Sequence, residues 1–390
     1  MLIKDAESVD ARYATAAVRK HRRIFAARRE RALGEIALAK VIEAARVPAM
    51  SPSGKLLQTV RLAILAMSIL AATSSARADA VSELAGFSVF PKVDLAQLNR
   101  GDAKPLRSGS SGGARYLAVQ TAYVAPDPPA ELLSKMRSWN PSRHPELKVY
   151  LHGESATDYS RLQNAPSNSA VRYLASATAQ RSSDLQLSAA EMKQLSAEGT
   201  DQGGMSGVIG NTWAKILSER ARAFASGGSS AQPPYDNSTP PVRVGEELSG
   251  LLRGQEKIRR QFSGLLEATG IGRGAGSIKP DLYWELLSAD EKGVLTLGAH
   301  YSRAGAGGMI QTANALYYAS GGYYAGITLH QLWPVEVEGR ASTLVWRGDM
   351  ISSASVGSLR GIERIAAEST MIKDISRVVS FFRRDSGSTR

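Results

Sequence analysis

The pattern of hydrophobic and polar residues changes character twice along residues 82–390. In the first region, to about residue 155, Arg115–Val124 is rich in β-branched and aromatic residues and predicts a strand. Asp127–Ser138 begins with an Asp-Pro pair, which is typical of a helix start. Glu146–His152 then alternates apolar and polar residues, as a second strand does. This order predicts a β-α-β unit.

The region from about 156 to 270 has the 3.6-residue period of helices. A capping-box pattern, Ser188 to Glu191, opens a short helix that is expected to end at Gly199. Apolar stripes predict further helices over Asn168–Gln180, Thr212–Phe224 and Glu246–Ala268. Between the last two, the composition of residues 226–241 (SGGSSAQPPYDNSTPP) predicts a flexible loop. This loop is either a domain boundary or an excursion from one domain.

The last region predicts consecutive antiparallel hairpins and a closing helix. β-rich runs stand in pairs around short turns, at Leu282–Ser288 and Val294–Tyr301, Asn314–Ala319 and Tyr323–Leu332, and Val335–Val337 and Ser342–Arg347. A long helix is expected over Ser358–Phe382. Its apolar stripe comprises Leu359, Ile362, Ile365, Ile372, Ile375, Val379 and Phe382. Such a stripe predicts that the helix lies across one face of the sheet.

Together these elements predict an α+β fold. An antiparallel β-meander carries a long C-terminal helix packed on it, and a β-α-β unit and a helical middle region precede them. This element order resembles the helix-grip architecture of START-like lipid-transfer domains. The resemblance implies an apolar cavity between sheet and helix, which is the usual form of a small-molecule site. A filled core is the alternative.

Residues 50–78 have the parts of a cleavable bacterial signal peptide. Lys55 and Arg61 supply a positive segment, and Leu62–Ala72 (LAILAMSILAA) is an uncharged apolar run. This run is too short to span a bilayer comfortably, because a transmembrane helix needs about 20 apolar residues. We therefore expect the export machinery and signal peptidase to process the chain, and a soluble periplasmic or secreted product to result.

Cleavage is expected after the small residues Ala76 and Ala78, directly before Asp79. Residues 79–390 are then the mature exported region, a single α+β domain. Because Met50 is a natural start for such a signal, residues 1–49 are interpreted as an upstream extension that is not native. The alternative is a genuine Arg-rich cytoplasmic arm, which would keep the apolar run as an uncleaved membrane anchor.

Charge and cysteine content exclude several classes of function. The chain has a net charge of +12, but residues 1–78 hold 14 Lys and Arg and 6 Asp and Glu, which leaves 34 basic and 30 acidic residues, a net of +4, after them. These charges are scattered, so no nucleic-acid partner is expected. The chain has no cysteine, which excludes thiolate metal sites and cysteine nucleophiles. No histidine stands in a metal-ligand spacing, so neither a metal nor another cofactor is expected.

Two histidines are candidates for acid-base chemistry. His300 and His330 each lie near the end of a predicted strand, and histidine titrates near neutral pH. Asp349 or Glu285 could orient one of them as a general base, and a serine beside the pair would make the chain an exported hydrolase. A hydrogen-bonded histidine within a strand is the simpler interpretation.

Aromatic residues are concentrated in the hairpins, where adjacent side chains must point to opposite faces of a sheet. Half of them are therefore expected outside the core, where they could contact a ligand or partner. The residues expected to bind a ligand are Tyr318, Tyr324, His330, Trp333 and Trp346. Non-enzymatic binding of an apolar small molecule or a cell-envelope component is the first hypothesis. An exported hydrolase and an envelope structural or assembly factor are the alternatives.

Overall fold

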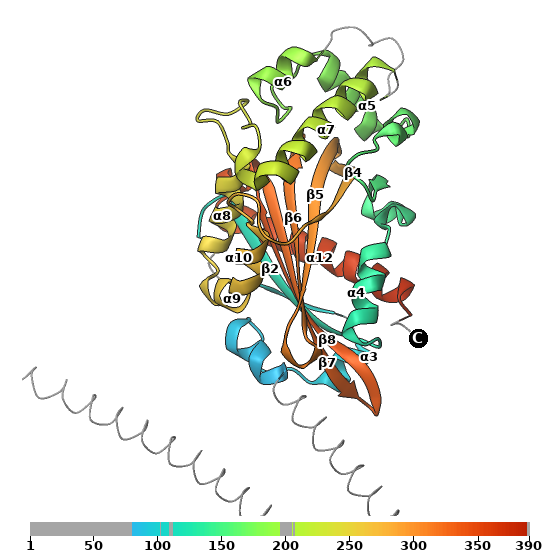
Figure 1. The fold of residues 1–390 in the computed structure, drawn as a ribbon, viewed down its shortest axis with the longest axis vertical. Helices are drawn as coiled ribbons and strands as arrows, with labels where there is room; N and C mark the ends of the chain where they lie inside the picture. Colours follow the sequence, from blue (N-terminus) through green and yellow to red (C-terminus); the bar gives the residue numbers. More distant parts are fainter. Residues whose placement is uncertain (1–79, 102, 109–111, 196–204, 206, 388–390) are drawn as a thin grey trace, which may run out of the picture. The chain divides into compact units, whose positions relative to one another are not determined.

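The computed structural model describes residues 80–101, 103–108, 112–195, 205 and 207–387 (Figure 1). Within these residues, eight strands form one antiparallel sheet with the order β1-β2-β8-β7-β6-β5-β4-β3. The strands are β1 (Lys104–Arg107), β2 (Tyr116–Ala125), β3 (Val149–Gly153), β4 (Asp281–Ala289), β5 (Lys292–Ala304), β6 (Ile310–Ala319), β7 (Ala325–Val337) and β8 (Arg340–Ser352). The predicted α+β fold with a meander and a C-terminal helix is confirmed.

Two of the predicted hairpin turns are tight because their residues adopt left-handed backbone conformations. Asp290 and Glu291 join β4 to β5 with φ of 47° and 64°, and Glu338 and Gly339 join β7 to β8 with φ of 52° and 75°. Turns with two positive φ values match the twist of the strands that they connect. The predicted runs at Tyr323–Leu332 and Val335–Val337 prove to be one strand, β7.

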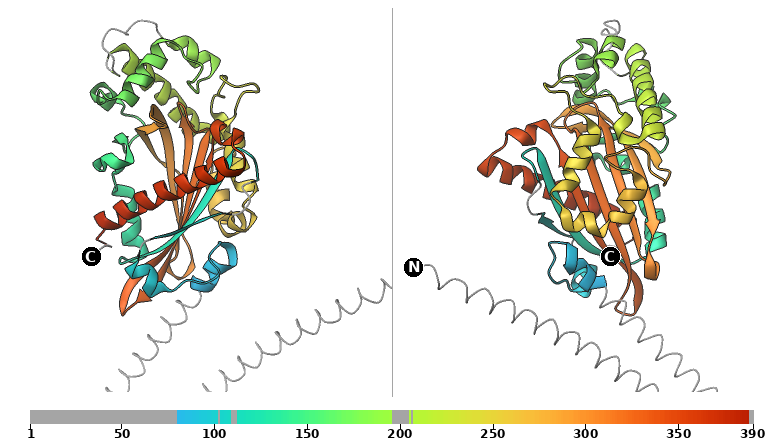
Figure 2. Two further views of the ribbon diagram at one scale, coloured as in Figure 1. Left: turned by 180° about the vertical axis from the view of Figure 1, so that it is seen from behind. Right: turned by 60° about the vertical axis from the view of Figure 1, so that its left-hand side comes forward.

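Helices cover both faces of the sheet, and each face has its own apolar core. One face carries the helix of residues 80–87 with α5 (Ser169–Ala179), α7 (Val208–Gly227), α8 (Val244–Arg253), α9 (Glu256–Gln261) and α10 (Ser263–Thr269). The other face carries α4 (Pro129–Ser138) and α12 (Gly361–Asp385). Figure 2 shows α12 crossing this second face diagonally. We call the two sides the middle-helix face and the α12 face.

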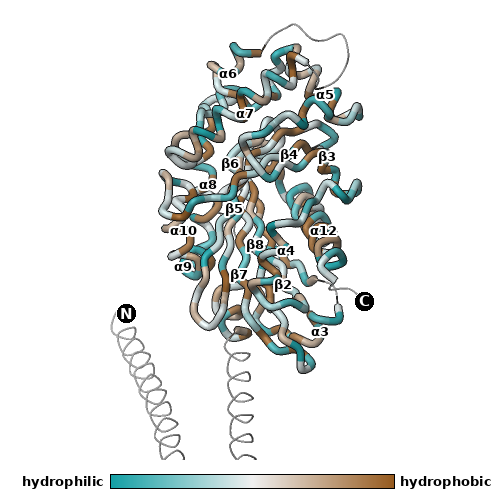
Figure 3. Tube along the Cα trace, turned by 45° about the vertical axis from the view of Figure 1, so that its right-hand side comes forward, coloured by the Kyte–Doolittle hydropathy of each residue, from teal (hydrophilic) through white to brown (hydrophobic). Residues whose placement is uncertain are grey.

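Side chains alternate between these two faces along each strand. In β8, Leu344 and Trp346 pack on the middle-helix face, whereas Val345 packs on the α12 face. Brown stretches in Figure 3 mark hydrophobic residues along the central strands and along part of α12. Because both faces are covered, the aromatic residues of the hairpins are almost all buried, and the expectation that half lie outside the core is wrong.

Only the C-terminal half of α12 uses the predicted apolar stripe. Ile375, Val379 and Phe382 are buried against the sheet, but Ile362 is 84 % exposed and Ile365 48 % exposed. The helix begins at Gly361, after the short α11 (Ala354–Ser358), and its first turns lie beside the edge strand β1. A straight helix that crosses a twisted sheet cannot contact it along its whole length, so the first half of the stripe stays exposed.

The predicted helices of the middle region are present with different bounds: α6 (Ala189–Gln194) ends before Gly199, and α7 begins at Val208 and not at Thr212. Asn168 caps α5, and Ser188 and Glu191 form the predicted capping box at the start of α6. The helix expected over Glu246–Ala268 is instead three helices, α8, α9 and α10. Gly254, at the first break, lies so close to the backbone of Gly112 that a Cβ on Gly112 would stand 2.9 Å from its Cα.

The loop predicted at residues 226–241 is anchored at several points. Its first residues belong to α7 and to the 3-10 helix η5 (Gly228–Ala231). Tyr235 is wholly buried, and its hydroxyl bonds the Tyr324 carbonyl at 3.2 Å and the Ala319 amide at 3.3 Å. Gln232 donates to the Arg220 carbonyl at 2.9 Å. The segment is therefore fixed to the core through Tyr235 and Gln232, and its flexibility stays a prediction.

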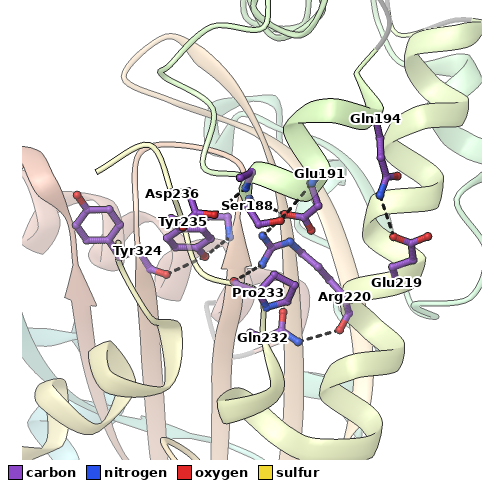
Figure 4. A network of polar contacts seen from close by, with 12 residues as sticks. Ser188, Glu191, Gln194, Glu219, Arg220, Gln232, Pro233, Tyr235, Asp236 and Tyr324 are labelled. Atoms are coloured by element: carbon purple, nitrogen blue, oxygen red, sulfur yellow. Dashed lines mark hydrogen bonds and ion pairs between the residues drawn. The ribbon is translucent and has the colours of Figure 1, made fainter. Parts of the chain in front are cut away.

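A buried ion pair connects α6, α7 and this loop (Figure 4). Arg220 of α7 contacts Glu191 of α6 at 2.6 Å, and neither side chain reaches solvent appreciably. The guanidinium also lies over the ring of Tyr318 in β6, 4.2 Å from its centroid. The Arg220 guanidinium therefore joins the middle helices to the sheet.

The predicted signal peptide, its cleavage site at Ala76, Ala78 and Asp79, and the segment 1–49 all lie outside the described residues. Across the range that the structure does describe, no helix has both the length and the apolar character needed to cross a membrane.

Candidate functional site

A cavity of about 310 Å³ lies between the α12 face of the sheet and the helices that cover it. Its outer wall is mainly apolar and comes from α4, α12 and the segment that leads into β3. The outer wall consists of Leu133, Met136, Trp139, Pro141, Leu147, Val378, Val379 and Phe382, with Arg137 among them. The space between sheet and C-terminal helix is therefore hollow at this point, and not filled as in the alternative interpretation.

The floor of the cavity differs from the wall, because polar side chains cross the sheet from strand to strand. We call this set the polar band, and its members are His152, Tyr283, Glu285, His300, Thr312, Asn314, Thr328, His330 and Arg347. The expected apolar cavity thus has one apolar wall and one polar wall.

Strand register brings the polar band together. His152 of β3 pairs with Glu285 of β4, and His300 of β5 pairs with Asn314 of β6. Thr312 of β6 pairs with His330 of β7, which in turn pairs with Arg347 of β8. Directly paired residues have Cβ atoms about 4.5–5.5 Å apart. Residues from six strands are therefore neighbours on one face.

Two irregularities of the sheet complete the floor. A register shift between Val149 and Leu151 brings both Val149 and His152 to the cavity, although regular alternation would place them on opposite faces. At Gly298, a Cβ would stand 2.1 Å from Cζ of Tyr283, so only glycine leaves room for this ring. The Tyr283 ring consequently stacks on His300, with centroids 4.6 Å apart.

Hydrogen bonds hold most of the polar band in place. His152 Nδ1 lies 2.9 Å from Glu285 Oε1, and His330 Nδ1 lies 3.1 Å from Thr312 Oγ1. The Tyr283 hydroxyl is 3.1 Å from Asn314 Oδ1 and 2.9 Å from its Nδ2.

At the Arg347 end of the polar band lies a second carboxylate, that of Asp349. Arg347 donates twice to Asp349, each time at 2.7 Å, and Thr328 donates to the same carboxylate at 2.9 Å. Both side chains of this ion pair are largely buried.

Burial sets the protonation states of the band. It lowers the pKa of His300 to about 4, helped by the neighbouring His152, and it lowers the pKa of His330 well below the usual value, helped by Arg347. Burial also raises the pKa of Tyr283. Both histidines are therefore neutral at pH 7, and the Tyr283 phenol keeps its proton.

The five residues expected to bind a ligand are divided between the two faces. His330 lies in the polar band, whereas Tyr318, Tyr324, Trp333 and Trp346 belong to the core of the middle-helix face. The indole of Trp333 donates to Glu83 at 2.8 Å and that of Trp346 to Gln120 at 3.0 Å, so both are satisfied within the core. The structure does not bring these four residues to the cavity that contains His330.

A β-bulge explains part of this division. Leu297 pairs with Tyr318 and Gly298 with Leu316, so Tyr317 is an extra residue in β6. Tyr317 and Tyr318 are both fully buried in the core of the middle-helix face, although they are adjacent in sequence. A bulge depends on the partner strand and leaves no clear sequence signal.

The histidines considered for catalysis do lie in the cavity, but their partners differ from those expected. Glu285 contacts His152, and Asp349 contacts Arg347 and Thr328. Among the described residues that line the cavity there is no serine. His152 was missed as a site residue, although its place at the end of an alternating strand could have indicated it.

No group of three or more His, Asp or Glu among the described residues is placed to hold a metal ion. Comparisons with known proteins give no further guide, since no protein-family model, no curated protein and no solved structure matches this chain.

Proposed function

We propose that this protein binds a small amphipathic molecule in the cavity between its sheet and α12. The polar group of the ligand contacts the polar band, and its apolar body contacts the wall formed by α4 and α12. The observation that carries this proposal is the cavity itself, in which one wall is polar and the other apolar.

The free-energy cost of burying the polar band supports a binding role. Burying a polar group without full compensation destabilises a fold, and apolar residues would fill this space more favourably. The lowered pKa values of His300 and His330 reflect this desolvation. A volume of about 310 Å³ is at the lower end of the range for small-molecule sites, which favours a compact ligand.

The burial of the hairpin aromatics bears on the alternatives. An envelope assembly factor that acts through an exposed aromatic patch is not favoured, because these residues are buried in the described structure. A serine hydrolase is not favoured either, because the lining residues supply no serine beside a histidine.

A fluorescence titration with anilinonaphthalene sulfonate tests the binding proposal. This probe is amphipathic and brightens in apolar surroundings. Leu133→Trp adds bulk to the cavity wall and should weaken binding about tenfold, or ~1.4 kcal/mol. The matched control is Val208→Trp, an exposed position on the middle-helix side, which should leave binding unchanged. Equal affinity of all three proteins would overturn the proposal.

Native mass spectrometry of protein extracted without denaturant tests for a natural ligand. We expect a bound mass that is released on denaturation, and less of it in Leu133→Trp. An extracted protein that carries no added mass and does not bind the probe would contradict a binding function.

We also propose export, on the sequence of residues 50–78 alone. N-terminal analysis of protein from the periplasmic fraction should find a chain that begins at Asp79. A chain that retains residues before Leu62 would instead favour the membrane-anchored alternative.

A further inference from the structure

We propose that the cavity is catalytic and that His152 is its general base, removing a proton from the carbon beside a carbonyl group of an uncharged, apolar-bodied substrate. This inference rests on the proposed function, because it assigns chemistry to a molecule bound in the same cavity. His152 is the catalytic residue and Glu285 is a positioning residue.

His152 is paired with Glu285 on the floor of the cavity. The carboxylate lies 2.9 Å from Nδ1, and an ionised carboxylate only accepts hydrogen bonds, so Nδ1 carries the proton. In the neutral imidazole, the other ring nitrogen, Nε2, then presents a lone pair. No protein group among the described residues bonds Nε2, and His152 lines the cavity. A carboxylate that fixes the tautomer of a histidine is the usual arrangement for a general base.

The other two histidines of the cavity lack this arrangement. The described structure records no hydrogen bond for the His300 ring, which stacks on Tyr283, and His330 contacts the Thr312 hydroxyl through Nδ1. A carboxylate partner therefore distinguishes His152 within the polar band.

Two hydrogen-bond donors, the Tyr283 hydroxyl and the Asn314 amide, also line the cavity beside the base. The rings of His152 and Tyr283 have centroids 5.8 Å apart, and the Tyr283 hydroxyl contacts Asn314. Burial keeps the phenol protonated, and when the Asn314 amide donates to the phenol oxygen at 2.9 Å the phenol hydrogen is left to donate to a substrate oxygen. Preplaced donors of this kind stabilise a negative charge that develops on oxygen.

These groups suffice for a proton transfer without a co-reactant. Nε2 of His152 takes the proton, and the electron pair of the broken C–H bond forms the carbon–carbon double bond of an enolate. The negative charge moves to the former carbonyl oxygen, where Tyr283 and Asn314 stabilise it. The imidazolium then returns the proton to the same carbon or to a conjugated one, which gives an isomerised product.

Covalent acyl transfer is not favoured by the same lining. No serine or cysteine is found among the described lining residues, and both threonine hydroxyls are hydrogen-bonded, Thr312 to His330 and Thr328 to Asp349. The base therefore has no neighbouring nucleophile to activate.

Nitrobenzisoxazole is a suitable probe because it is flat and uncharged and reports a positioned base directly. A base removes its ring C–H proton, the electron pair forms a nitrile, the ring N–O bond breaks, and the released phenolate is coloured. The full-length protein should accelerate this reaction above buffer. His152→Gln should lower kcat/KM about a hundredfold, since general-base catalysis contributes factors of that order or more.

The chain supplies a matched control in His144, which contacts Asp385 at 2.7 Å but does not line the cavity. His144→Gln should react as fast as the unchanged protein. Glu285→Gln should lower kcat with little change in KM, and Glu285→Asp should restore part of the rate. A merely structural role for Glu285 would not produce this rescue.

Competition with anilinonaphthalene sulfonate separates the two proposals. If nitrobenzisoxazole displaces the dye but reacts no faster than in buffer, or if His152→Gln is as active as the unchanged protein, the catalytic inference is overturned and the binding proposal stands. If nitrobenzisoxazole neither reacts nor displaces the dye, and the dye binds Leu133→Trp as tightly as the unchanged protein, both proposals fail. Loss of activity in His152→Gln but not in His144→Gln supports both.

Discussion

Replacing Glu191 by Gln should destabilise the fold by about 3–5 kcal/mol, because it leaves a buried charge without its partner. Arg220 is 0 % exposed and Glu191 is 4 % exposed, and their closest atoms are 2.6 Å apart (Figure 4). An arginine cannot lose its proton to avoid the penalty. The uncompensated guanidinium must then remain in the interior or pull the middle helices away from the sheet.

The variant is chosen to isolate the charge. In the capping box, the Glu191 carboxylate accepts from the amide and the hydroxyl of Ser188, both at 2.8 Å. The amide oxygen of Gln can still accept these bonds, so the start of α6 is preserved. The loss in stability then reports the missing ion pair and not a missing helix cap.

A double-mutant cycle measures the pair directly. Arg220→Met fills similar space and should cost less than Glu191→Gln, about 2–3 kcal/mol, because Glu191 keeps its bonds to Ser188 and can take up a proton. The double variant buries neither charge and should be more stable than the sum of the two losses predicts, by up to ~3 kcal/mol.

Urea unfolding followed by tryptophan fluorescence gives the free energy of unfolding for each variant. The control is Asp374→Asn in α12, which breaks an exposed pair with Arg377 and should cost no more than about 1 kcal/mol. If Glu191→Gln costs no more than this control, the buried pair does not stabilise the fold and the reasoning is refuted.

Three further predictions concern the cavity and its wall. The pKa of His300 is lowered to about 4 by burial and by His152. As the pH falls, the unfolded chain therefore binds a proton near pH 6.5, whereas the folded chain binds that proton only near pH 4. The free energy of unfolding should fall by ~3 kcal/mol as the pH is lowered from 6.5 to 4. In urea titrations, His300→Asn should make the free energy of unfolding depend less on pH over this range, and an unchanged pH dependence would contradict the prediction. Gly298→Ala should cost about 1–3 kcal/mol by displacing Tyr283, whereas Gly326→Ala, whose nearest neighbour is 3.5 Å away, should cost much less, and equal shifts in unfolding midpoint would argue against the clash. Val379→Ala should destabilise by about 1.5 kcal/mol, against less than about 0.5 kcal/mol for Ile365→Ala, since only the C-terminal half of α12 packs on the sheet; similar losses would place the whole helix in the core.

Local patterns determined most of the elements. The capping box at Ser188 and Glu191 and the turns at Asp290–Glu291 and Glu338–Gly339 were predictable because their signals lie within a few residues. Alternation and helical period likewise predicted the strands of the meander and the long final helix. They predicted an α+β fold for the same reason, since each element shows its own apolar face in its own sequence.

Boundaries that depend on distant contacts were not predictable. The gap between the predicted runs Tyr323–Leu332 and Val335–Val337 is not an end of a strand, because β7 continues through Pro334 and still pairs with β8 there. Pairing with β6 ends at Leu332, and a proline is tolerated where a strand has lost one of its neighbours. The break between α8 and α9 lies where the backbone of Gly112 approaches Gly254, a contact between segments far apart in sequence.

Tertiary structure decided which side chains meet in the candidate site. Sequence indicated His300 and His330, but it could not show that β3 joins the edge of the sheet and sets His152 against Glu285. Two register shifts then determined which side chains face which side of the sheet. The shift at Tyr150 affects the residues that line the cavity, and the shift at Tyr317 affects the residues in the core of the middle-helix face. The physical reason is that a one-residue change in register moves every following side chain to the other face, and register is a property of a pair of strands. The sequence by itself therefore determined which elements form, and the pairing of those elements determined which residues face the cavity.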